Sequence, residues 1–494
     1  MKRALRQLEQ AIAHASDYAT WREASEEHDR LSGAEDWKEI DRSPYYDYEL
    51  IRNRLAQIRQ ARERGDVNKL VFHLHEGLHG NLGNISNPML YRFSRVGTKR
   101  LIEHYLAEVT TALNYLCDNE FEEFPFKDKL DFFETTGQAF GQSCLMLSGG
   151  AALGLFHIGV CKALWEQGLL PSVISGSSAG SIIASVVGSH DDSEMQCKLQ
   201  PENLYLEAFR YIGWAGILRG TPVLDGDHLE ACLEENIPDL TFEEAYRKTG
   251  REINITVSPY DRHQHARLLN WRTSPNVLIR KATLASCAIP GIYPPVNLWA
   301  KNLEGEKVPY IPGRKFVDGS IKDDLPIRRL ARLYGVNHSI VSQTNPHIVP
   351  FLPRASDRSR TLPVLTDWLV RNVAMNLRYG VELAQSRVHS NDLGLMLDKA
   401  KSVLSQNYVG DINLIPPRRP LSLLKVLANP TVDDVRNYIR TGERTTWPSM
   451  DMVRNSTHIS RTFHACLQRL DKLEAEKLQR LRLVSEQSNR LSAQ

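Results

Sequence analysis

The sequence predicts an α/β fold with a helical N-terminal addition, on three observations. The short apolar run "CLML" is followed by two glycines and then by "LGLFHIGVCKALWEQG", which has helical spacing. A second run, "SVIS", leads through a glycine-framed serine into "SIIASVVG". Further strand-like runs, "EINITVSPY", "KFVDGS" and "HSIVSQTNPH", alternate with helical stretches such as "PNVLIRKATLASC". This repetition is typical of a mostly parallel sheet flanked by crossover helices.

The chain divides into three predicted domains. Residues 1–140 form a helical domain, with apolar positions at helical spacing in "YYDYELIRNRLAQIRQARERG" and "GTKRLIEHYLAEVTTALNYLCD" around the turn cluster "LHGNLGNISNP". Residues 141–350 hold the α/β domain. Residues 351–494 are mostly helical, with one more strand at "YVGDINLIP" and a charged amphipathic helix at the end.

The composition favours a globular protein and excludes several classes. Hydrophobic residues make up 42% and charged residues 24%, and a net charge of +2 argues against a nucleic-acid protein. The seven cysteines are scattered without a C-x-x-C pair, so we predict reduced thiols, no metal site and no cofactor. The N-terminal residues lack the apolar core of a signal peptide, and a cytoplasmic location is predicted.

Two uncharged windows have the length of a membrane span. Both Ser143–Cys161 and Leu169–Gly188 lack Asp, Glu, Lys and Arg. The first contains two adjacent glycines and a histidine, and the second contains a proline, glycines and six serines. Because a spanning helix needs about 20 predominantly apolar residues, neither window is predicted to cross a membrane.

The second window carries the pentapeptide G-x-S-x-G. Ser178 is framed by Gly176 and Gly180, after a predicted strand and before a predicted helix. That arrangement places a nucleophilic serine on a sharp strand-to-helix turn, at the positive end of the helix dipole. Alone the pentapeptide is a weak signal, because a glycine-rich turn is often only a turn.

Two other stretches complete a candidate site. The glycine loop, Ser148–Gly154 ("SGGAALG"), enters a helix, so the N–H groups of Gly149, Gly150 and Ala151 can face an oxyanion. A tight packing turn is the alternative, and a phosphate loop is disfavoured because no Lys-Ser or Lys-Thr follows. Asp318, followed by Gly319 at the end of a predicted strand, is a candidate base, although Asp-Gly is also a common turn dipeptide.

These motifs give the chain a resemblance to the patatin-like phospholipases. "GGAALG", "GSSAG", "DGS" and "KATLASCAIPGIYPPV" resemble the segments of that family. "GNLGNISNPMLYRFSRVGTKRLIEHYLAEV", "LLNWRTSPNVLIRKA" and "VSQTNPHIVPF" are similar to its triacylglycerol-lipase subgroup, which has an extra N-terminal helical domain. The resemblance extends from about residue 45 to residue 417.

The resemblance implies a serine lipid acyl hydrolase with a two-residue dyad. Ser178 would attack an ester carbonyl, Asp318 would accept its proton, and the glycine loop would hold the oxyanion. The chain departs from the family's G-G-G-x-R/K-G loop at Ala151 and Leu153. Without a basic residue at 153, an uncharged acylglycerol is mildly favoured over a phospholipid. No histidine has an aspartate five residues later, so acyl transfer by an H-x-x-x-x-D motif is unsupported.

Two other interpretations remain open. A Ser-His-Asp hydrolase would need a histidine after the acid, and His338, His347 and His389 are candidates by position. Alternatively, the protein binds lipid without catalysis, and the serine turn is only packing. The expected partner is a lipid substrate at a membrane or lipid-droplet surface, with no nucleic acid. The sequence does not indicate the oligomeric state.

A candidate face for contact with a membrane or lipid-droplet surface lies in the C-terminal region. It consists of apolar residues that recur at near-helical spacing: Trp368, Leu369, Val373, Leu377 and Leu383. A place in the core is the alternative interpretation for the same residues.

Overall fold

The computed structural model describes residues 1–204, 209–211, 224–261, 264–321, 323–346, 349, 409–417 and 428–492. It consists of two compact units. The first comprises Met1–Ser143, Tyr334–His338 and Asp451–Gln494, and the second Cys144–Leu333 and Ser339–Met450. Because most of residues 351–427 lie outside the described ranges, the three-domain division at 140 and 350 stays a prediction. The same holds for the apolar face around Trp368.

The first unit is helical, as predicted for the N-terminal region. Its helices are α1 (Lys2–His14), α2 (Tyr18–Ser32), α3 (Ala34–Glu39), α4 (Tyr48–Glu63), α5 (Val67–Gly77), α6 (Arg100–Asp118), α7 (Phe126–Phe140) and α20 (Met450–Ser492). Short 3-10 turns, η1 (Leu82–Asn84) and η2 (Pro88–Tyr91), occupy the predicted turn cluster. The predicted helix at the end of the chain is α20, and its residues Ile459, Phe463 and Leu470 join the core of this unit.

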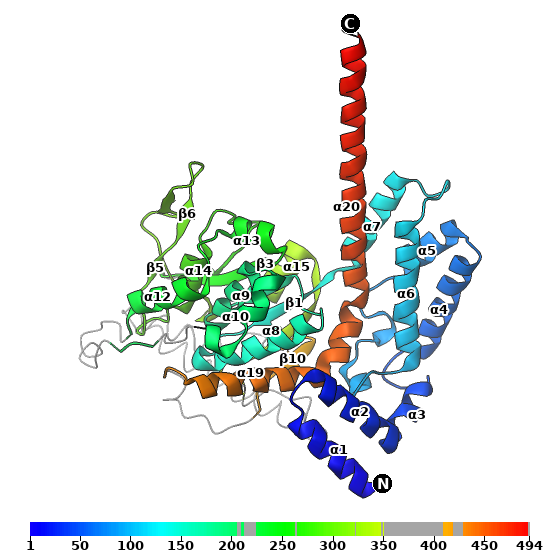
Figure 1. The fold of residues 1–494 in the computed structure, drawn as a ribbon, viewed down its shortest axis with the longest axis horizontal. Helices are drawn as coiled ribbons and strands as arrows, with labels where there is room; N and C mark the ends of the chain where they lie inside the picture. The colour runs from blue at the N-terminus through cyan, green and yellow to red at the C-terminus, as the bar shows by residue number, and fades with distance from the viewer. Residues whose placement is uncertain are drawn as a thin grey trace. The chain divides into compact units, whose positions relative to one another are not determined.

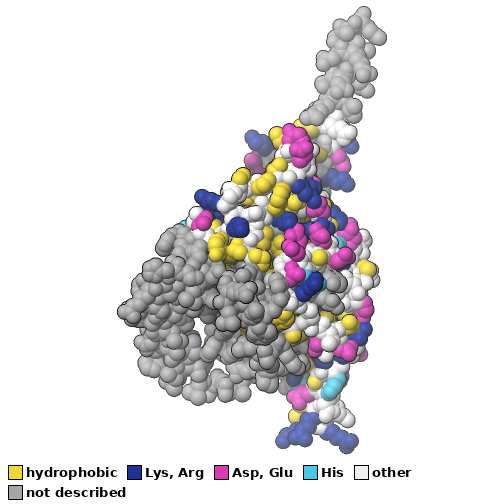
Figure 2. Space-filling model, turned by 90° about the vertical axis from the view of Figure 1, so that its left-hand side faces the viewer, with side chains coloured by type: hydrophobic (Ala, Val, Ile, Leu, Met, Phe, Trp, Pro, Cys, Tyr) yellow, Lys and Arg dark blue, Asp and Glu magenta, His cyan; other side chains and the backbone are white. Residues whose placement is uncertain are grey.

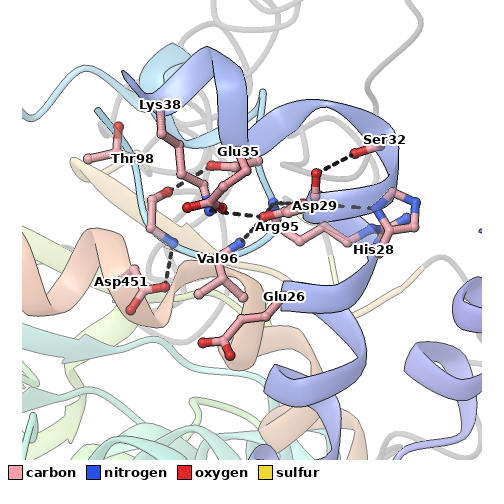
Figure 3. A network of polar contacts seen from close by, with 12 residues as sticks. Glu26, His28, Asp29, Ser32, Glu35, Lys38, Arg95, Val96, Thr98 and Asp451 are labelled. Atoms are coloured by element: carbon pink, nitrogen blue, oxygen red, sulfur yellow. Dashed lines mark hydrogen bonds and ion pairs between the residues drawn. The ribbon is translucent and has the colours of Figure 1, made fainter. Parts of the chain in front are cut away.

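A buried carboxylate fastens helix α2 to the loop that precedes α6 (Figure 3). Asp29 accepts hydrogen bonds from the N–H groups of Arg95, at 2.9 Å, and Val96, at 3.0 Å. Lys38 Nζ lies 3.4 Å from the same carboxylate and 2.8 Å from Glu35. The buried charge is therefore both paired and hydrogen-bonded, which is the condition under which a protein interior tolerates one.

A mixed sheet of eight strands is found among the described residues. In neighbour order the strands are β10 (Ile412–Leu414), β9 (Val336–Ser342), β1 (Gln142–Leu147), β2 (Val173–Gly176), β3 (Glu252–Pro259), β8 (Lys315–Asp318) and β5 (Val296–Asn297), and β4 (Arg267–Leu269) also pairs with β3. Strands β1, β2 and β3 are parallel, as are β9 and β10, which confirms the predicted fold class. Strands β4 and β8 run antiparallel to β3, a reversal that the sequence analysis did not foresee.

Helices follow the strands as the sequence analysis predicts. In the second unit they are α8 (Phe156–Glu166), α9 (Ala179–Ser189), α10 (Asp192–Lys198), α12 (Gly226–Asn236), α13 (Phe242–Thr249), α14 (Ile279–Cys287), α15 (Ile327–Tyr334) and α19 (Val432–Thr446). All eight residues of β3 are buried, as expected for a strand covered on both faces. A separate hairpin is formed by β6 (Trp299–Lys301) and β7 (Lys307–Pro309).

The two uncharged windows do not form continuous helices. The first becomes β1, the glycine loop and the start of α8, and the second becomes β2, the serine turn and α9. In the described part of the chain, every helix is too short or too polar to cross a membrane. The face drawn in Figure 2 carries Lys and Arg side chains interspersed with Asp and Glu among the residues shown in colour.

Helices α8 and α19 lie side by side in close contact (Figure 1). Glycines stand at the contact on both helices. A Cβ built on Gly442 would lie 3.0 Å from Gly159 Cα, and one built on Gly159 would lie 2.7 Å from the carbonyl carbon of Ile439. Lys162 Nζ adds an ion pair with Glu443 at 2.5 Å. The backbones therefore approach each other as only glycine permits.

We predict that Gly442→Val lowers the free energy of unfolding by about 3 kcal/mol, because the new side chain must push α19 away from α8. Urea unfolding measures the loss. The control is Arg440→Val, which puts the same side chain on an exposed position of the same helix and should cost less than about 1 kcal/mol. Equal losses in the two variants would contradict the close contact.

Candidate active site

Ser178 occupies a strained turn between β2 and α9. Its backbone angles are φ 52° and ψ −127°, a combination that residues with a side chain rarely adopt. The residue caps the N-terminus of α9 and is 6% exposed. This is the geometry expected of a serine aimed out of a strand-to-helix turn.

The glycines on either side are required by close packing. A Cβ on Gly176 would lie 2.6 Å from Ser181 Cα, and a Cβ on Gly180 would lie 2.7 Å from the carbonyl oxygen of Ser148. Neither position has room for a side chain. The framing glycines of the motif are therefore explained by space alone, without any appeal to chemistry.

The end of α14 holds the serine turn in place. Ser286 Oγ accepts the N–H of Ser178 at 3.0 Å and donates to the carbonyl of Thr256 at 2.8 Å. The Cys287 thiol donates to the Ser178 carbonyl at 3.3 Å. Burial, with the nearby Asp318 charge, raises the pKa of the Cys287 thiol, so it remains a protonated donor. The sequence analysis did not single out either residue.

Asp318 is the last residue of β8 and is fully buried. Its N–H donates to the carbonyl of Ala288 at 3.0 Å, and its Oδ1 accepts the N–H of Ser320 at 2.8 Å. Its Oδ2 accepts no hydrogen bond from any residue that the structure describes. Gly319 follows because a Cβ there would lie 2.9 Å from Thr256 Cβ. A buried carboxylate oxygen without a donor is costly and therefore calls for an explanation.

Strand register brings Ser178 and Asp318 to the same level of the sheet. Gly176 of β2 pairs with Ile255 of β3, and Ser178 follows two residues later. Asp318 pairs with Val257, which is also two residues beyond Ile255. The serine and the aspartate thus flank β3 from opposite sides. No hydrogen bond joins their side chains in this structure.

The glycine loop packs directly against the serine. A Cβ on Gly149 would lie 3.2 Å from Ser178 Cβ. The N–H of Gly149 donates to Asp324 Oδ1 at 2.9 Å. The N–H groups of Gly150 and Ala151 have no acceptor among the described residues. Of the three predicted oxyanion donors, these two are the ones still available.

A buried histidine lies behind the loop, and the sequence analysis missed it. His157 Nε2 donates to the carbonyl of Ser148 at 2.9 Å and lies 3.1 Å from Thr344 Oγ1, while Nδ1 accepts from Ser342 Oγ at 2.7 Å. Burial lowers the pKa of His157 to about 4, so the ring is neutral at pH 7. In the sequence, the one signal of a buried histidine was its position within the otherwise apolar segment "LFHIGV".

We predict that His157 makes the protein acid-sensitive. Its pKa is about 6.5 in the unfolded chain and about 4 in the folded one, so the unfolded state binds the proton first as the pH falls. The free energy of unfolding should therefore drop by about 3 kcal/mol between pH 6.5 and pH 4. Urea unfolding across this range should show a smaller drop for His157→Gln than for wild type.

The matched control is His265→Gln, which removes an exposed histidine of the same unit. Its stability should depend on pH as that of wild type does. An unchanged pH profile in His157→Gln would show that the ring is not buried in the neutral form.

An apolar pocket opens at Ser178. Its empty space, including the mouth, amounts to about 740 Å3. The walls come from the glycine loop, α9, α12 and the segment after α14, and include Ala152, Leu155, Ile182, Ile183, Leu229, Cys232, Asn236, Cys287, Ile289 and Tyr293. None of the described residues that line it is Asp, Glu, Lys, Arg or His. Such a pocket suits a hydrocarbon chain.

The predicted alternative histidines gain no support from the described residues. His338 Nδ1 lies 2.9 Å from Ser143 Oγ. His347 and His389 lie outside the described residues. Among the residues the structure does describe, no cluster of three or more His, Cys, Asp or Glu side chains could hold a metal ion.

Comparison with known proteins assigns the family. Residues 145–331 match the patatin-like phospholipase family, and residues 1–138 match a domain of unknown function, DUF3336. Triacylglycerol lipase ptl3 of Schizosaccharomyces pombe is 32% identical over 93% of this chain and 97% of its own length. The chain belongs to the patatin-like phospholipase family.

Other relatives in this patatin-like group are longer than the chain. Triacylglycerol lipase 4 of Saccharomyces cerevisiae is 36% identical over 90% of this chain, and Triacylglycerol lipase SDP1L of Arabidopsis thaliana is 34% identical over 92%. The chain spans only 51% and 57% of these two proteins. Both names agree with the subgroup that the sequence motifs predicted.

At two positions, 151 and 153, the glycine loop differs from the family pattern, and the structure shows the effect of each difference. Ala151, in place of the third glycine, has φ 47°, where a methyl group is strained. Leu153, in place of the basic residue, is 7% exposed. The loop therefore keeps the backbone turn of a glycine-rich sequence, but brings an apolar side chain where the family pattern has a charge.

Proposed function

We propose that the protein hydrolyses carboxylic esters of acylglycerols, with Ser178 as nucleophile and Asp318 as proton acceptor. One observation carries the proposal: the strained serine opens onto an apolar pocket whose described lining residues carry no charge. The buried, unpartnered Oδ2 of Asp318 at the same level of the sheet adds support. A binding protein would need neither the strain nor the buried carboxylate.

The chemistry proceeds in two halves. Asp318 takes the proton of Ser178 as Oγ attacks the ester carbonyl, and the N–H groups of Gly150 and Ala151 stabilise the tetrahedral oxyanion. The ester C–O bond breaks, Asp318 returns the proton to the leaving alcohol, and an acyl-serine remains. Water, deprotonated by Asp318, then attacks the acyl-serine; the C–Oγ bond breaks, Asp318 returns the proton to Ser178 Oγ, and a fatty acid is released.

The pocket chemistry favours an uncharged acylglycerol over a phospholipid. An acyl chain fits walls made of apolar side chains, whereas a phosphate headgroup would need a cation near the loop. Leu153 supplies none. Relatives named triacylglycerol lipases in yeasts and a plant point to the same substrate class.

The test is hydrolysis of triolein, phosphatidylcholine and a short p-nitrophenyl ester by the purified chain. A fluorophosphonate probe, mapped by mass spectrometry, identifies the nucleophile independently of substrate choice. We expect cleavage of triolein and of the p-nitrophenyl ester, slower cleavage of phosphatidylcholine, and a single label on Ser178.

The other interpretations predict different results. Vesicle binding without hydrolysis or labelling would favour a lipid-binding protein. Labelling of Ser178 together with loss of activity in an Ala variant of His338, His347 or His389 would favour a Ser-His-Asp triad. Faster cleavage of phosphatidylcholine than of triolein would overturn the substrate assignment but leave the ester hydrolase intact.

A further inference from the structure

Gly149 is held through both of its peptide groups. Its N–H donates to Asp324 Oδ1 at 2.9 Å, and its carbonyl oxygen accepts from Ser148 Oγ at 3.1 Å and Thr344 Oγ1 at 3.3 Å. Thr344 is in turn positioned by its own contact with His157. The glycine that touches Ser178 is therefore fixed in orientation from two opposite sides.

Asp324 comes from a part of the chain remote in sequence from the loop. It lies six residues after Asp318, between the turn that follows β8 and helix α15, and is only 2% exposed. A bond from a backbone N–H to a buried carboxylate is charge-assisted and directional. The contact thus fixes the position of Gly149 relative to the segment that carries the candidate base.

The orientation of Gly149 determines where the next two N–H groups point. Gly150 packs closely against Thr344, since a Cβ there would lie 2.9 Å from Thr344 Cβ. Ala151 is already in a left-handed conformation, with φ 47°. A rotation of the Gly149 peptide would therefore move the N–H groups of Gly150 and Ala151 away from the carbonyl that Ser178 attacks.

We propose that Asp324 is a positioning residue for the oxyanion loop. It engages the Gly149 N–H, so that Gly149 serves as a fixed support and the oxyanion is held by Gly150 and Ala151. This inference rests on the proposed ester hydrolysis. It assigns a role to Asp324, a second buried carboxylate in addition to Asp318, and this role does not include taking a proton from Ser178.

The experiment compares kcat and KM of three variants on a p-nitrophenyl ester. Asp324→Ala removes the acceptor, and kcat should fall at least ten-fold with KM within about two-fold, because the oxyanion forms only in the transition state. Asp324→Asn keeps an acceptor oxygen and should retain at least a third of kcat. Asp323→Asn alters the neighbouring carboxylate, which pairs with Arg329 instead of the loop, and should match wild type.

Binding of an alkyl trifluoromethyl ketone separates positioning from general damage. This inhibitor forms a hemiketal oxyanion on the serine, so its affinity should fall in Asp324→Ala in parallel with kcat/KM. If Asp324→Ala fails to fold, Thr344→Val tests the same loop from its other side and should lower kcat about two- to ten-fold with KM unchanged.

Three results would overturn the inference. They are wild-type kcat in folded Asp324→Ala, a loss confined to KM, and an Asn variant as impaired as the Ala variant. In each case wild type still cleaves the ester, so the proposed function stands. If wild type cleaves no ester, the proposed function and the inference fall together.

Discussion

Replacing Ser178 by glycine is expected to abolish ester hydrolysis and to raise the free energy of unfolding by about 1 kcal/mol. Loss of the nucleophile should lower kcat by roughly 10⁴-fold or more. The stability gain follows from φ 52° and ψ −127°, which strain serine but not glycine. Ser178→Ala should be equally inactive without the gain, because alanine keeps the strain. Activity assays and urea unfolding of the same preparations measure both effects.

The matched control is Ser177→Ala. The Ser177 hydroxyl is buried next to the nucleophile and has no hydrogen-bond partner among the described residues. Its loss should leave hydrolysis near the wild-type rate. Full activity in Ser178→Ala, or equal stability of the Gly and Ala variants at position 178, would contradict the assignment of Ser178 as a strained nucleophile.

Replacing Asp318 by asparagine is expected to lower kcat by roughly 10³- to 10⁴-fold, comparable to loss of the acid in a serine triad. The amide has nearly the same shape and can still accept the Ser320 N–H, which Asp318 Oδ1 now accepts at 2.8 Å. It cannot take a proton from Ser178. Because folding should be preserved, the loss should appear in kcat at an unchanged melting temperature.

Fluorophosphonate labelling gives a second readout for Asp318. The rate at which Ser178 is labelled should fall with kcat, since both need a deprotonated serine. If Asp318→Asn kept more than a tenth of wild-type kcat, Asp318 would not be the base. Replacement of His338, His347 and His389 would then be the next step.

The candidate site could be predicted in part because its motifs have strict spatial requirements. Glycines at 176 and 180 are needed wherever a strand turns this tightly into a helix, so the serine turn is visible in the sequence. Asp318 was recognisable from the resemblance and from its glycine neighbour. His157, Ser286 and Asp324 were not, because a lone polar residue in an apolar segment gives no sign of which distant atom it contacts.

The sequence by itself determined the local elements: apolar runs became strands, helical spacing became helices, and glycines marked the turns. Only the tertiary structure decided that β8 runs antiparallel to β3, which brings Asp318 level with Ser178. It also decided that Asp324 occupies the Gly149 N–H. Local patterns reflect interactions between near neighbours in the chain, whereas these contacts join residues 61 positions apart (Val257 and Asp318) and 175 positions apart (Gly149 and Asp324), and no local preference encodes them.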